Sequence, residues 1–386
     1  MESTYYQENG YFSDGLLNFS VGTIGPKLLK DCKPIIQKAT DIKLSEENCS
    51  GLFQYGPTCG DRYLRKELAT FLEERYGDHV DRDDLICTAG ATNGLITICN
   101  LLFTAGDYIF IGDVSYYSNI MYMKHLQYNM VTVPMDDNGM IIDKLEEKIR
   151  SIGSSLTKSD DSDKPYSAMV YIIPTFQNPT GRCLSEDRCR QLVQLARRHK
   201  LLVFADDVAN LVYHGDEKYP PRRLFSYDCR EDADFYGNVI SNSSFSKVFC
   251  PGICKGWMET PKRIIDMLEL YSPVSCGYNH YMDGIMEVQK RKLAIKDALI
   301  KYMPDFVVYE IPEGGYFIWI DLHVNAEEIL KMCTEQHRIA FFPASRVALS
   351  GGYETQIRFS VSYYEEDILT NAIRKIADVV KNYNQN

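Results

Sequence analysis

The residue best placed for chemistry is Lys247, which ends the polar segment Ser243-Ser244-Phe245-Ser246-Lys247 and precedes a Pro251-Gly252 turn. The amine of a lysine attacks carbonyl carbons when its surroundings lower its pKa, and a loop at the mouth of a pocket does this better than a solvated helix face. The segment therefore favours an imine-forming lysine. By itself it is also compatible with an ordinary surface lysine in a polar loop.

Two further polar residues follow apolar runs that indicate buried strands. Asp206 ends the run 201–205, and Asn178 comes shortly after the run 169–173. In open α/β sheets, ligands bind beyond the carboxyl ends of such strands. A carboxylate there can pair with a pyridinium nitrogen and an amide can donate to a ring oxygen, so Asp206, Asn178 and Lys247 together predict a pyridoxal phosphate site. Alone, the Asn-Pro and Thr-Gly pairs around Asn178 would indicate only a turn.

The start of a predicted helix supplies a candidate phosphate site. Gly90, Ala91 and Thr92 stand between a short strand, 85–87, and an apolar helical pattern, 95–103. Unpaired backbone amides at a helix start, next to a threonine hydroxyl, suit an anion. The signal is weak on its own, because small residues and threonine also begin many helices as caps.

The elements that must position these residues alternate along the chain. Strand and helix signals succeed each other over about 49–271, which predicts a parallel sheet with helices on both faces. Residues 61–76 show an amphipathic pattern typical of a helix, and residues 185–200 are expected to form another. From about residue 278 the pattern becomes helix, strands and two helices, and this tail is expected to pair with the first residues of the chain. Asp207 is expected to be solvated or to cap a helix.

The order of these motifs, along nearly the whole chain, resembles that of the class I/II aminotransferases of fold type I. Further matching segments are Gly22, Tyr55-Gly56-Pro57, Asp113-Val114-Ser115-Tyr116, Gly314-Gly315-Tyr316-Phe317 and Ile357-Arg358-Phe359. The chain is most similar to the 2-aminoadipate, aromatic and branched-chain group. The resemblance implies an α/β fold with a mostly parallel central sheet, helices on both faces and a smaller α+β domain. Residues 49–275 would form the large cofactor-binding domain, and residues 1–48 and 276–386 the small one.

The resemblance also implies a role for each matching residue. Lys247 would be catalytic, forming the aldimine with pyridoxal 5'-phosphate and moving the proton at the substrate α-carbon. Residues of the large domain, and a tyrosine from the partner subunit of a homodimer with shared active sites, would hold the cofactor: Gly90, Ala91, Thr92, Tyr116, Asn178, Asp206, Ser244 and Tyr55. Gly22, Asn178 and Arg358 would bind the substrate. The enzyme would move an amino group between an L-amino acid and a 2-oxo acid.

Three features depart from the family pattern. Ala209 stands where the family has a tyrosine whose hydroxyl helps to hold the ring oxygen, and Cys254 stands where it has a phosphate-binding arginine. Lys255 is adjacent to Cys254, but neighbours in an extended strand point to opposite faces. The segment 271–284 looks shorter than its family counterpart. From Cys254 we expect a weaker hold on the cofactor, and from Ala209 an altered pKa of the imine.

Two other kinds of function stay open from the residues alone. Decarboxylases and carbon–sulfur lyases share this fold, and the reaction depends on which bond of the α-carbon stands perpendicular to the cofactor ring. The departures at Ala209, Cys254 and 271–284 also leave room for a binding or regulatory relative with impaired catalysis.

Composition excludes several classes of protein. The 386 residues are 45% hydrophobic and 25% charged, as in ordinary globular proteins. A net charge of −11 argues against nucleic acid and anionic membrane partners. The twelve cysteines lack the paired spacing of a zinc site, so no metal is expected, and they suit a reducing compartment. The first residues resemble no targeting segment and no run is long and apolar enough for a bilayer, so we expect a cytoplasmic protein.

Overall fold

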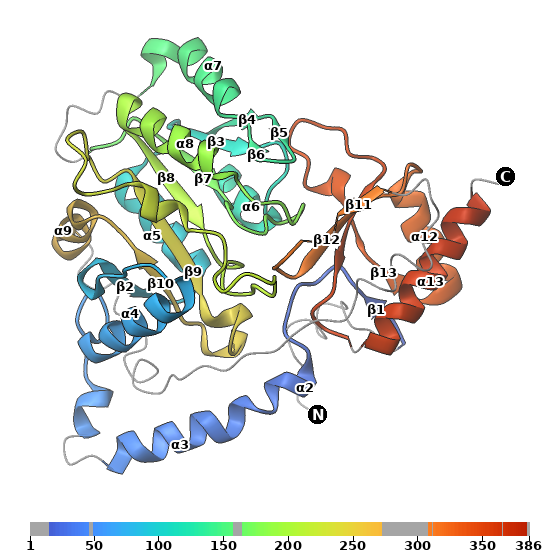
Figure 1. The fold of residues 1–386 in the computed structure, drawn as a ribbon, viewed down its shortest axis with the longest axis horizontal. Helices are drawn as coiled ribbons and strands as arrows, with labels where there is room; N and C mark the ends of the chain where they lie inside the picture. The colour runs from blue at the N-terminus through green and yellow to red at the C-terminus, as the bar shows by residue number, and fades with distance from the viewer. Residues whose placement is uncertain are drawn as a thin grey trace.

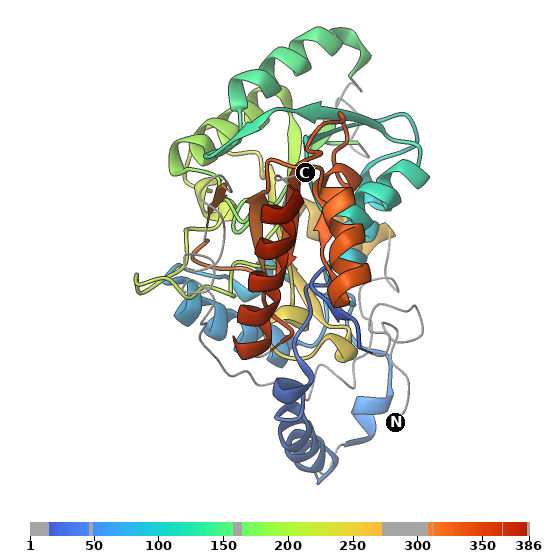
Figure 2. The ribbon, with the colours of Figure 1, turned by 90° about the vertical axis from the view of Figure 1, so that its right-hand side faces the viewer.

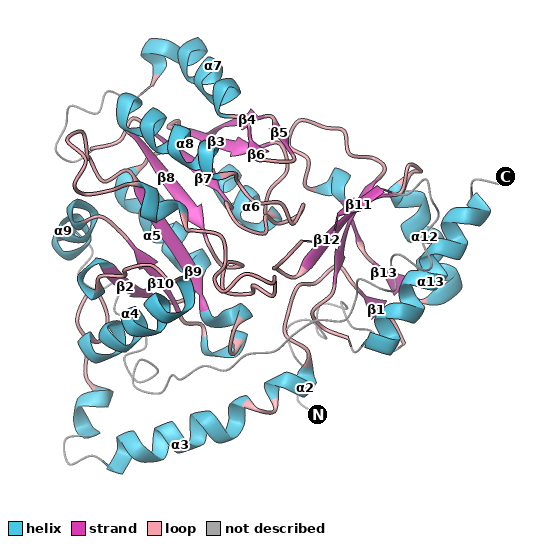
Figure 3. Ribbon diagram, viewed as in Figure 1, coloured by secondary structure: helices cyan, strands magenta, loops and turns pink. Residues whose placement is uncertain are grey.

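The computed structural model of the chain describes residues 15–45, 49–156, 164–271, 308–310, 312–364 and 366–383. Figure 1 shows a large sheet surrounded by helices beside a smaller sheet, and Figure 3 separates helices from strands by colour. Of the segment 271–284, which the sequence suggests is shortened, only Tyr271 belongs to the described residues.

The large sheet has seven strands. In sheet order they are β2 (Leu85–Thr88), β10 (Gly256–Glu259), β9 (Val239–Ser244), β8 (Leu201–Asp206), β7 (Ala168–Ile172), β3 (Tyr108–Gly112) and β4 (Asn129–Val133). The strands from β9 to β4 pair in parallel, while β10 is antiparallel to both of its neighbours. Every residue of β2, β7, β8 and β9 is buried, as in a parallel sheet covered on both faces. The predicted, mostly parallel central sheet is confirmed.

Helices cover both faces of this sheet. One face carries α5 (Ala91–Leu102), α6 (Tyr117–His125) and α9 (Lys262–Tyr271), and the other carries α7 (Ile142–Ile152) and α8 (Glu186–His199). Strand β7 serves both cores, because successive side chains of a strand point to opposite faces. Met169 and Tyr171 pack on the first face, and Ala168 and Val170 pack on the second.

Capping residues set the bounds of α4 (Arg62–Tyr76), which confirms the predicted amphipathic helix. The Asp61 carboxylate accepts hydrogen bonds of 2.8 and 2.9 Å from the backbone amides of the second and third helical residues. Gly77 ends the helix with φ +66°, a left-handed conformation that suits glycine. The apolar face of α4 packs in a cluster with Trp257 of β10.

The smaller sheet has four strands, all paired antiparallel. Their order is β11 (Val308–Glu310), β12 (Phe317–Asp321), β15 (Gln356–Ser360) and β14 (Phe342–Pro343). Helices α12 (Ala326–His337) and α13 (Glu366–Tyr383) lie side by side against it, as Figure 2 shows. Near the other end of the chain, β1 (Leu17–Asn18) pairs in parallel with β13 (Ile339–Ala340). The predicted pairing of the first residues with the tail is therefore confirmed.

The N-terminal segment then crosses to the large sheet. It forms α2 (Pro26–Leu29) and α3 (Cys32–Ser45), and in Figure 1 α3 extends away from both sheets. The first turn of α3 is anchored, because Cys32 is buried in the cluster that α4 forms with Trp257. Among the helices of the described residues, none is both long and apolar enough to cross a membrane.

Candidate active site

The candidate site lies where several strands of the large sheet end together. Asp206 and Ser244 are the last residues of β8 and β9, and Asn178 follows β7 by one short loop. Gly90 follows β2, which runs in the same direction as these strands because β10 is antiparallel to both β2 and β9. These residues therefore meet at the carboxyl edge of the sheet, where ligands bind in this type of architecture.

Lys247 ends a 3-10 turn, η5 (Phe245–Lys247), directly after β9. The Ser244 hydroxyl caps this turn by accepting a 3.1 Å hydrogen bond from the Ser246 amide. The Lys247 amine donates to the Gly22 carbonyl at 2.6 Å, and the Tyr316 hydroxyl donates to the Lys247 carbonyl. Both contacts join the loop after β9 to segments that belong with the smaller sheet.

The Lys247 amine is prepared to act as a nucleophile. Burial, and after it the positive charge of Arg358, lowers its pKa to about 8. The negative charge of Asp206 opposes this shift. An amine with a pKa near 8 is neutral in an appreciable fraction of molecules at physiological pH, and only the neutral amine attacks a carbonyl.

Asp206 is a buried carboxylate that is bonded on one oxygen. Its Oδ2 accepts hydrogen bonds from the Tyr171 hydroxyl at 2.7 Å and from the Asn119 amide at 3.3 Å. Asn119 also donates to the Tyr171 hydroxyl at 2.8 Å. Burial raises the pKa of Asp206 to about 6, and the hydrogen bond from Tyr171 moderates the rise. Among the described residues, Oδ1 has no partner although it is buried, so it can accept a hydrogen bond from a ligand.

Asn119 and Tyr171 belong to the site but were not recognised in the sequence. Asn119 is a polar residue beside Ile120 in the apolar pattern of α6, and a buried polar residue of that kind requires a partner. Tyr171 lies on a strand that is buried on both faces, which supplies no reason for a hydroxyl there. These two features are the signals that could have identified them.

The expectation that Asp207 is solvated or caps a helix is wrong. Asp207 is fully buried, and its Oδ2 accepts a 2.5 Å hydrogen bond from Ser241. Burial raises its pKa to about 7. Asp207 follows a strand whose two faces are both covered, so the residue after the strand end still lies inside the molecule.

The start of α5 forms a small cradle. Gly90 is the N-cap residue, with φ +87° and without a side-chain capping bond, so the first amides of the helix point into open space. A Cβ on Gly90 would meet only the Ser244 hydroxyl oxygen, at 3.9 Å. Ala91 and Thr92 follow in the first turn, and Thr92 is exposed. Backbone amides beside a serine hydroxyl can bind a phosphate.

Arg358 faces this edge from β15 of the smaller sheet. Its Nη1 donates to Asn178 Oδ1 at 2.8 Å, and its Nη2 donates to the Ser20 carbonyl at 2.7 Å. The guanidinium carbon lies 4.2 Å from the centre of the Phe317 ring and 4.8 Å from that of Phe342. Burial lowers the pKa of Arg358 to about 10, so it remains cationic at neutral pH. A planar, fixed cation of this kind binds a carboxylate.

The three remaining residues predicted from the sequence differ in their placement. Gly22 lies at the site, with its carbonyl on Lys247 and its Cα so close to the Phe317 ring that a Cβ would overlap it at 2.2 Å. Tyr116 is the half-buried N-cap residue of α6. Tyr55 is 93% exposed, so within one chain it contributes nothing to the site.

The departures from the family pattern have visible consequences. Ala209 carries no hydroxyl next to Asp206, and its carbonyl accepts from Val212. Cys254 is exposed in a left-handed conformation, φ +50°, at the end of η6 (Pro251–Ile253), whereas Lys255 is buried. The two neighbours are therefore in different environments, although the left-handed Cys254 is not part of an extended strand.

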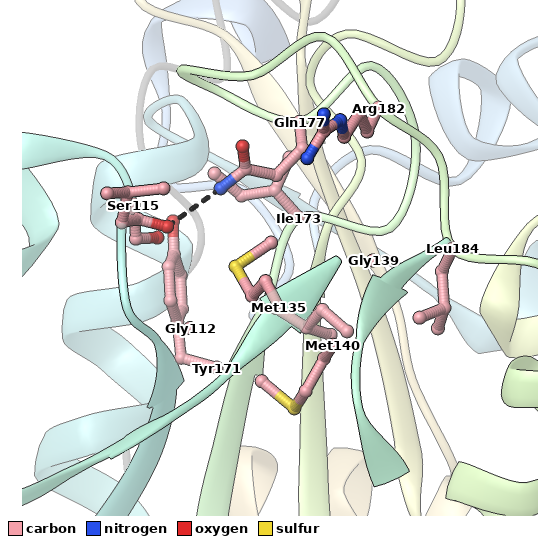
Figure 4. Close-up of a pocket in the computed structure, with 12 residues that line it drawn as sticks. Gly112, Ser115, Met135, Gly139, Met140, Tyr171, Ile173, Gln177, Arg182 and Leu184 are labelled. Carbon is pink, nitrogen blue, oxygen red and sulfur yellow. Dashed lines mark hydrogen bonds between the residues drawn. The ribbon is translucent and has the colours of Figure 1, made fainter. Parts of the chain in front are cut away.

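A pocket adjoins the site behind Tyr171. Figure 4 shows it between Ser115, Tyr171, Gln177 and Met135, with Gln177 donating to the Val114 carbonyl at 2.9 Å. It is lined from the loops after β3 and β7 and from the hairpin of β5 (Met135–Asp136) and β6 (Gly139–Met140). Lys247, Asp206 and Arg358 are not among its lining residues.

Comparison with known proteins agrees with this geometry. A family model described as aminotransferase class I and II matches residues 14–376. Aromatic-amino-acid aminotransferase 1 of Thermococcus litoralis is 27% identical, over 87% of this chain and 82% of its own. The 2-aminoadipate transaminase of Thermus thermophilus is 25% identical, over 95% and 90% of the two chains.

Solved structures show the same fold. The kynurenine aminotransferase of Pyrococcus horikoshii superposes with a TM-score of 0.80 at 24% identity, covering 99% of this chain and 95% of its own. The α-aminoadipate aminotransferase LysN of Thermus thermophilus, complexed with N-(5'-phosphopyridoxyl)-L-leucine, gives a TM-score of 0.76 at 23% identity, over 100% and 96%.

Proposed function

This chain belongs to the class I and II aminotransferases, and on that premise we propose that Lys247 carries the amino-transfer chemistry of a pyridoxal-phosphate-dependent enzyme. The substrates are an L-amino acid and a 2-oxo acid. The observation that carries the proposal is the Lys247 amine at the carboxyl edge of the sheet, where it donates to the Gly22 carbonyl and is influenced by the charges of both Arg358, which lowers its pKa, and Asp206, which raises it. One of these charges suits the cofactor ring and the other suits the substrate carboxylate.

The residues present fit pyridoxal phosphate. The buried Asp206 Oδ1, which has no partner among the described residues, matches the protonated ring nitrogen of the cofactor. The uncapped amides at Gly90, Ala91 and Thr92, next to the Ser244 hydroxyl, match its phosphate. When bound, the cofactor supplies an electron sink for the bond that breaks at the substrate α-carbon.

Two residues complete the hold on the cofactor ring. Asn178 Oδ1 is engaged by Arg358, so the amide nitrogen of Asn178 is the donor that remains for the ring oxygen. Tyr116, at the start of α6, covers the ring face. Because Ala209 offers no hydroxyl, the ring oxygen receives one hydrogen bond fewer than in relatives that have a tyrosine at this position.

The substrate is bound from the side of the smaller sheet. Arg358 pairs with its α-carboxylate, and the backbone at Gly22 borders the same space. Lys247 would take the α-proton of the substrate and return it, as general base and then general acid. The Tyr316 hydroxyl on the Lys247 carbonyl keeps the lysine backbone in place during this exchange.

The active unit is a homodimer with shared sites. Tyr55 is almost fully exposed, and further exposed apolar side chains lie near it in the chain: Ile42, Leu44, Phe53 and Tyr63. Ile42 and Leu44 lie on α3, which extends away from both sheets, and an exposed apolar set of this kind suits a second copy of the chain. Tyr55 would then reach the cofactor of the partner subunit.

Two further assignments are part of the proposal. Residues 49–275 form the large domain, and residues 1–48 and 276–386 the small one. The protein works in the cytoplasm, where thiols stay reduced, and both buried and exposed cysteines of the described residues, such as Cys99 and Cys229, are free thiols.

The test is an absorption spectrum of the purified protein with pyridoxal phosphate. Wild type is expected to show the visible band of the bound cofactor, an amino acid substrate bleaches it, and a 2-oxo acid restores it. Lys247→Ala loses the band. Lys262→Ala, which removes an exposed lysine from α9, keeps it. A wild type that stays colourless would refute the proposal.

The same measurement separates amino transfer from the other chemistry of this fold. A lyase would release ammonia together with a 2-oxo acid, and a decarboxylase would release carbon dioxide. If a 2-oxo acid restores the band in full and neither ammonia nor carbon dioxide is released, the reaction is amino transfer.

A further inference from the structure

Two thiols from distant parts of the chain meet next to the Lys247 loop. Cys32 is the first residue of α3, and Cys250 follows Lys247 by one short turn. The Cys32 thiol donates to the Phe249 carbonyl at 3.4 Å, so its sulfur lies against the peptide bond that leads into Cys250. Burial raises the pKa of the Cys32 thiol, and the neighbouring Cys250 raises it further.

The surroundings give the two thiols different roles. Cys32 is only 8% exposed and is packed among Phe249, Ile253 and Trp257. Cys250 lies at the edge of the same cluster and is partly exposed. An oxidant from solvent therefore reaches Cys250 first, with Cys32 beside it as the second thiol.

We propose that Cys32 and Cys250 form a reversible disulfide that ties α3 to the loop of Lys247. The oxidant is a small disulfide such as oxidised glutathione. The Cys250 thiolate attacks one sulfur of the oxidant, which gives a mixed disulfide and releases one molecule of the small thiol. Cys32 then loses its proton and attacks the Cys250 sulfur, which releases the second thiol. Two protein thiols are oxidised and one small disulfide is reduced.

The bond would add a covalent constraint to a loop that is otherwise held by hydrogen bonds and packing. The turn after Lys247 is held by the amides of Val248 and Phe249, which both donate to the Phe245 carbonyl. A cross-link between Cys32 and Cys250 fixes this turn to α3 and also closes a long loop of the chain. Oxidation therefore slows hydrogen exchange of these two amides and shifts thermal unfolding upward by several degrees.

The linkage is tested by mass spectrometry on the full-length protein after treatment with oxidised glutathione. Trypsin releases Cys250 and Cys254 in one peptide, 248–255, so the experiment uses a Cys254→Ser background. The expected product joins this peptide to 31–38 and is lighter than the sum of the two by two hydrogen atoms. Dithiothreitol separates them again.

Matched variants decide the assignment. Cys32→Ser and Cys250→Ser each lose the linked peptide, whereas Cys229→Ser, which removes another exposed thiol, retains it. If glutathione stays attached to Cys250 while Cys32 remains open to alkylation in denaturant, the proposal is wrong. The linkage is read without any activity measurement, so its outcome is independent of the proposed aminotransferase chemistry.

Discussion

At the scale of single residues, the pKa of Lys247 determines how fast the cofactor is loaded. The amine has a pKa lowered to about 8 by burial and by Arg358, so the neutral, reactive fraction falls about tenfold for each pH unit below 8. We expect the rate at which the protein without cofactor gains the visible band to rise with pH and to level off above about pH 8.

Substitution of Arg358 tests whether its charge lowers the pKa of Lys247. Arg358→Leu removes a neighbouring positive charge, so the pKa of Lys247 rises and the loading profile moves to higher pH. Arg346→Leu breaks only the exposed ion pair with Glu327 and leaves the profile in place. Stopped-flow absorbance over a pH series measures both. Profiles that coincide for wild type and Arg358→Leu would contradict the electrostatic account.

Asn119 and Tyr171 act through Asp206. Both donate to its Oδ2 and thereby favour the ionised carboxylate that pairs with the cofactor ring. Tyr171→Phe or Asn119→Ala is expected to raise the pKa of Asp206 and to weaken cofactor binding about tenfold, because a hydrogen bond to a charged group is worth roughly 1.5 to 3 kcal/mol. Equilibrium titration with pyridoxal phosphate gives the affinities.

A second buried tyrosine serves as the control. Tyr166 belongs to the same hydrophobic cluster as Tyr171, but its hydroxyl donates to the Gly237 carbonyl at 2.5 Å. Tyr166→Phe should cost stability and leave the affinity for pyridoxal phosphate unchanged. If it weakens cofactor binding as Tyr171→Phe does, the effect is structural and does not act through Asp206.

At the scale of elements, the close approach of β10 to the α5 cradle is expected to be necessary for cofactor retention. A Cβ on Gly256 would lie 2.5 Å from the Ser243 carbonyl oxygen and 2.9 Å from Gly90 Cα, both backbone atoms that cannot move aside alone. Gly256→Ala is expected to displace the cradle and to speed loss of the cofactor on dialysis by about tenfold or more. Gly252→Ala is the control, because its Cβ would meet only the Cys250 sulfur, at 3.9 Å.

Part of the fold can be predicted from the sequence, because periodic patterns of apolar residues indicate which side chains are buried. Helix α4 and the strands β2, β7 and β8 follow from amphipathic or continuous apolar runs, whereas β9, which ends in four polar residues, shows no such run. The motifs around Lys247 and Asp206 indicate these two residues as candidates, and Arg358 is indicated by the family resemblance. Asp207 was misjudged, because a pattern does not show what covers a strand end. Asn119 was not found because its partner, Asp206, is distant in the chain and only tertiary structure brings them together.

At the scale of the whole molecule, two buried carboxyls make stability depend on pH. Burial raises the pKa of Asp206 to about 6 and that of Asp207 to about 7 in the folded state, so the folded protein binds more protons than the unfolded chain between about pH 4 and 7. The contribution of these groups is fully present below about pH 4 and is lost as the pH rises through 6 and 7.

For the protein without cofactor, we therefore expect the contribution of this pair to the free energy of unfolding to decrease from pH 5 to pH 8. Each carboxyl contributes at most about 1.4 kcal/mol per pH unit. Asp207→Asn should reduce the slope of the free energy of unfolding against pH. Asp143→Asn, at the exposed start of α7, should leave this slope unchanged. Urea unfolding at several pH values measures these slopes. Equal slopes for wild type and Asp207→Asn would show that the Asp207 carboxyl does not cause the pH dependence.

The exposed apolar residues near Tyr55 allow a test of the proposed homodimer. Phe53 is 70% exposed and stands two residues before Tyr55. Phe53→Asp places a charge in the proposed apolar contact and should raise the dimer dissociation constant by at least about tenfold in analytical ultracentrifugation. Leu270→Asp changes a side chain of similar exposure, 68%, on α9 and should leave the dimer intact. A wild type that sediments as a monomer would overturn the dimer.

The hydrogen bond from Arg358 to the Ser20 carbonyl joins residues 338 positions apart in the chain. Translation therefore completes the cofactor cradle, which ends at β10, long before the substrate arginine leaves the ribosome. A nascent chain released early would have the residues proposed to take up pyridoxal phosphate but would lack Arg358, the residue proposed to bind the substrate carboxylate. Such a fragment would present a reactive carbonyl compound without substrate control, so quality control during synthesis matters more for this architecture than for one whose site lies within a short stretch of chain.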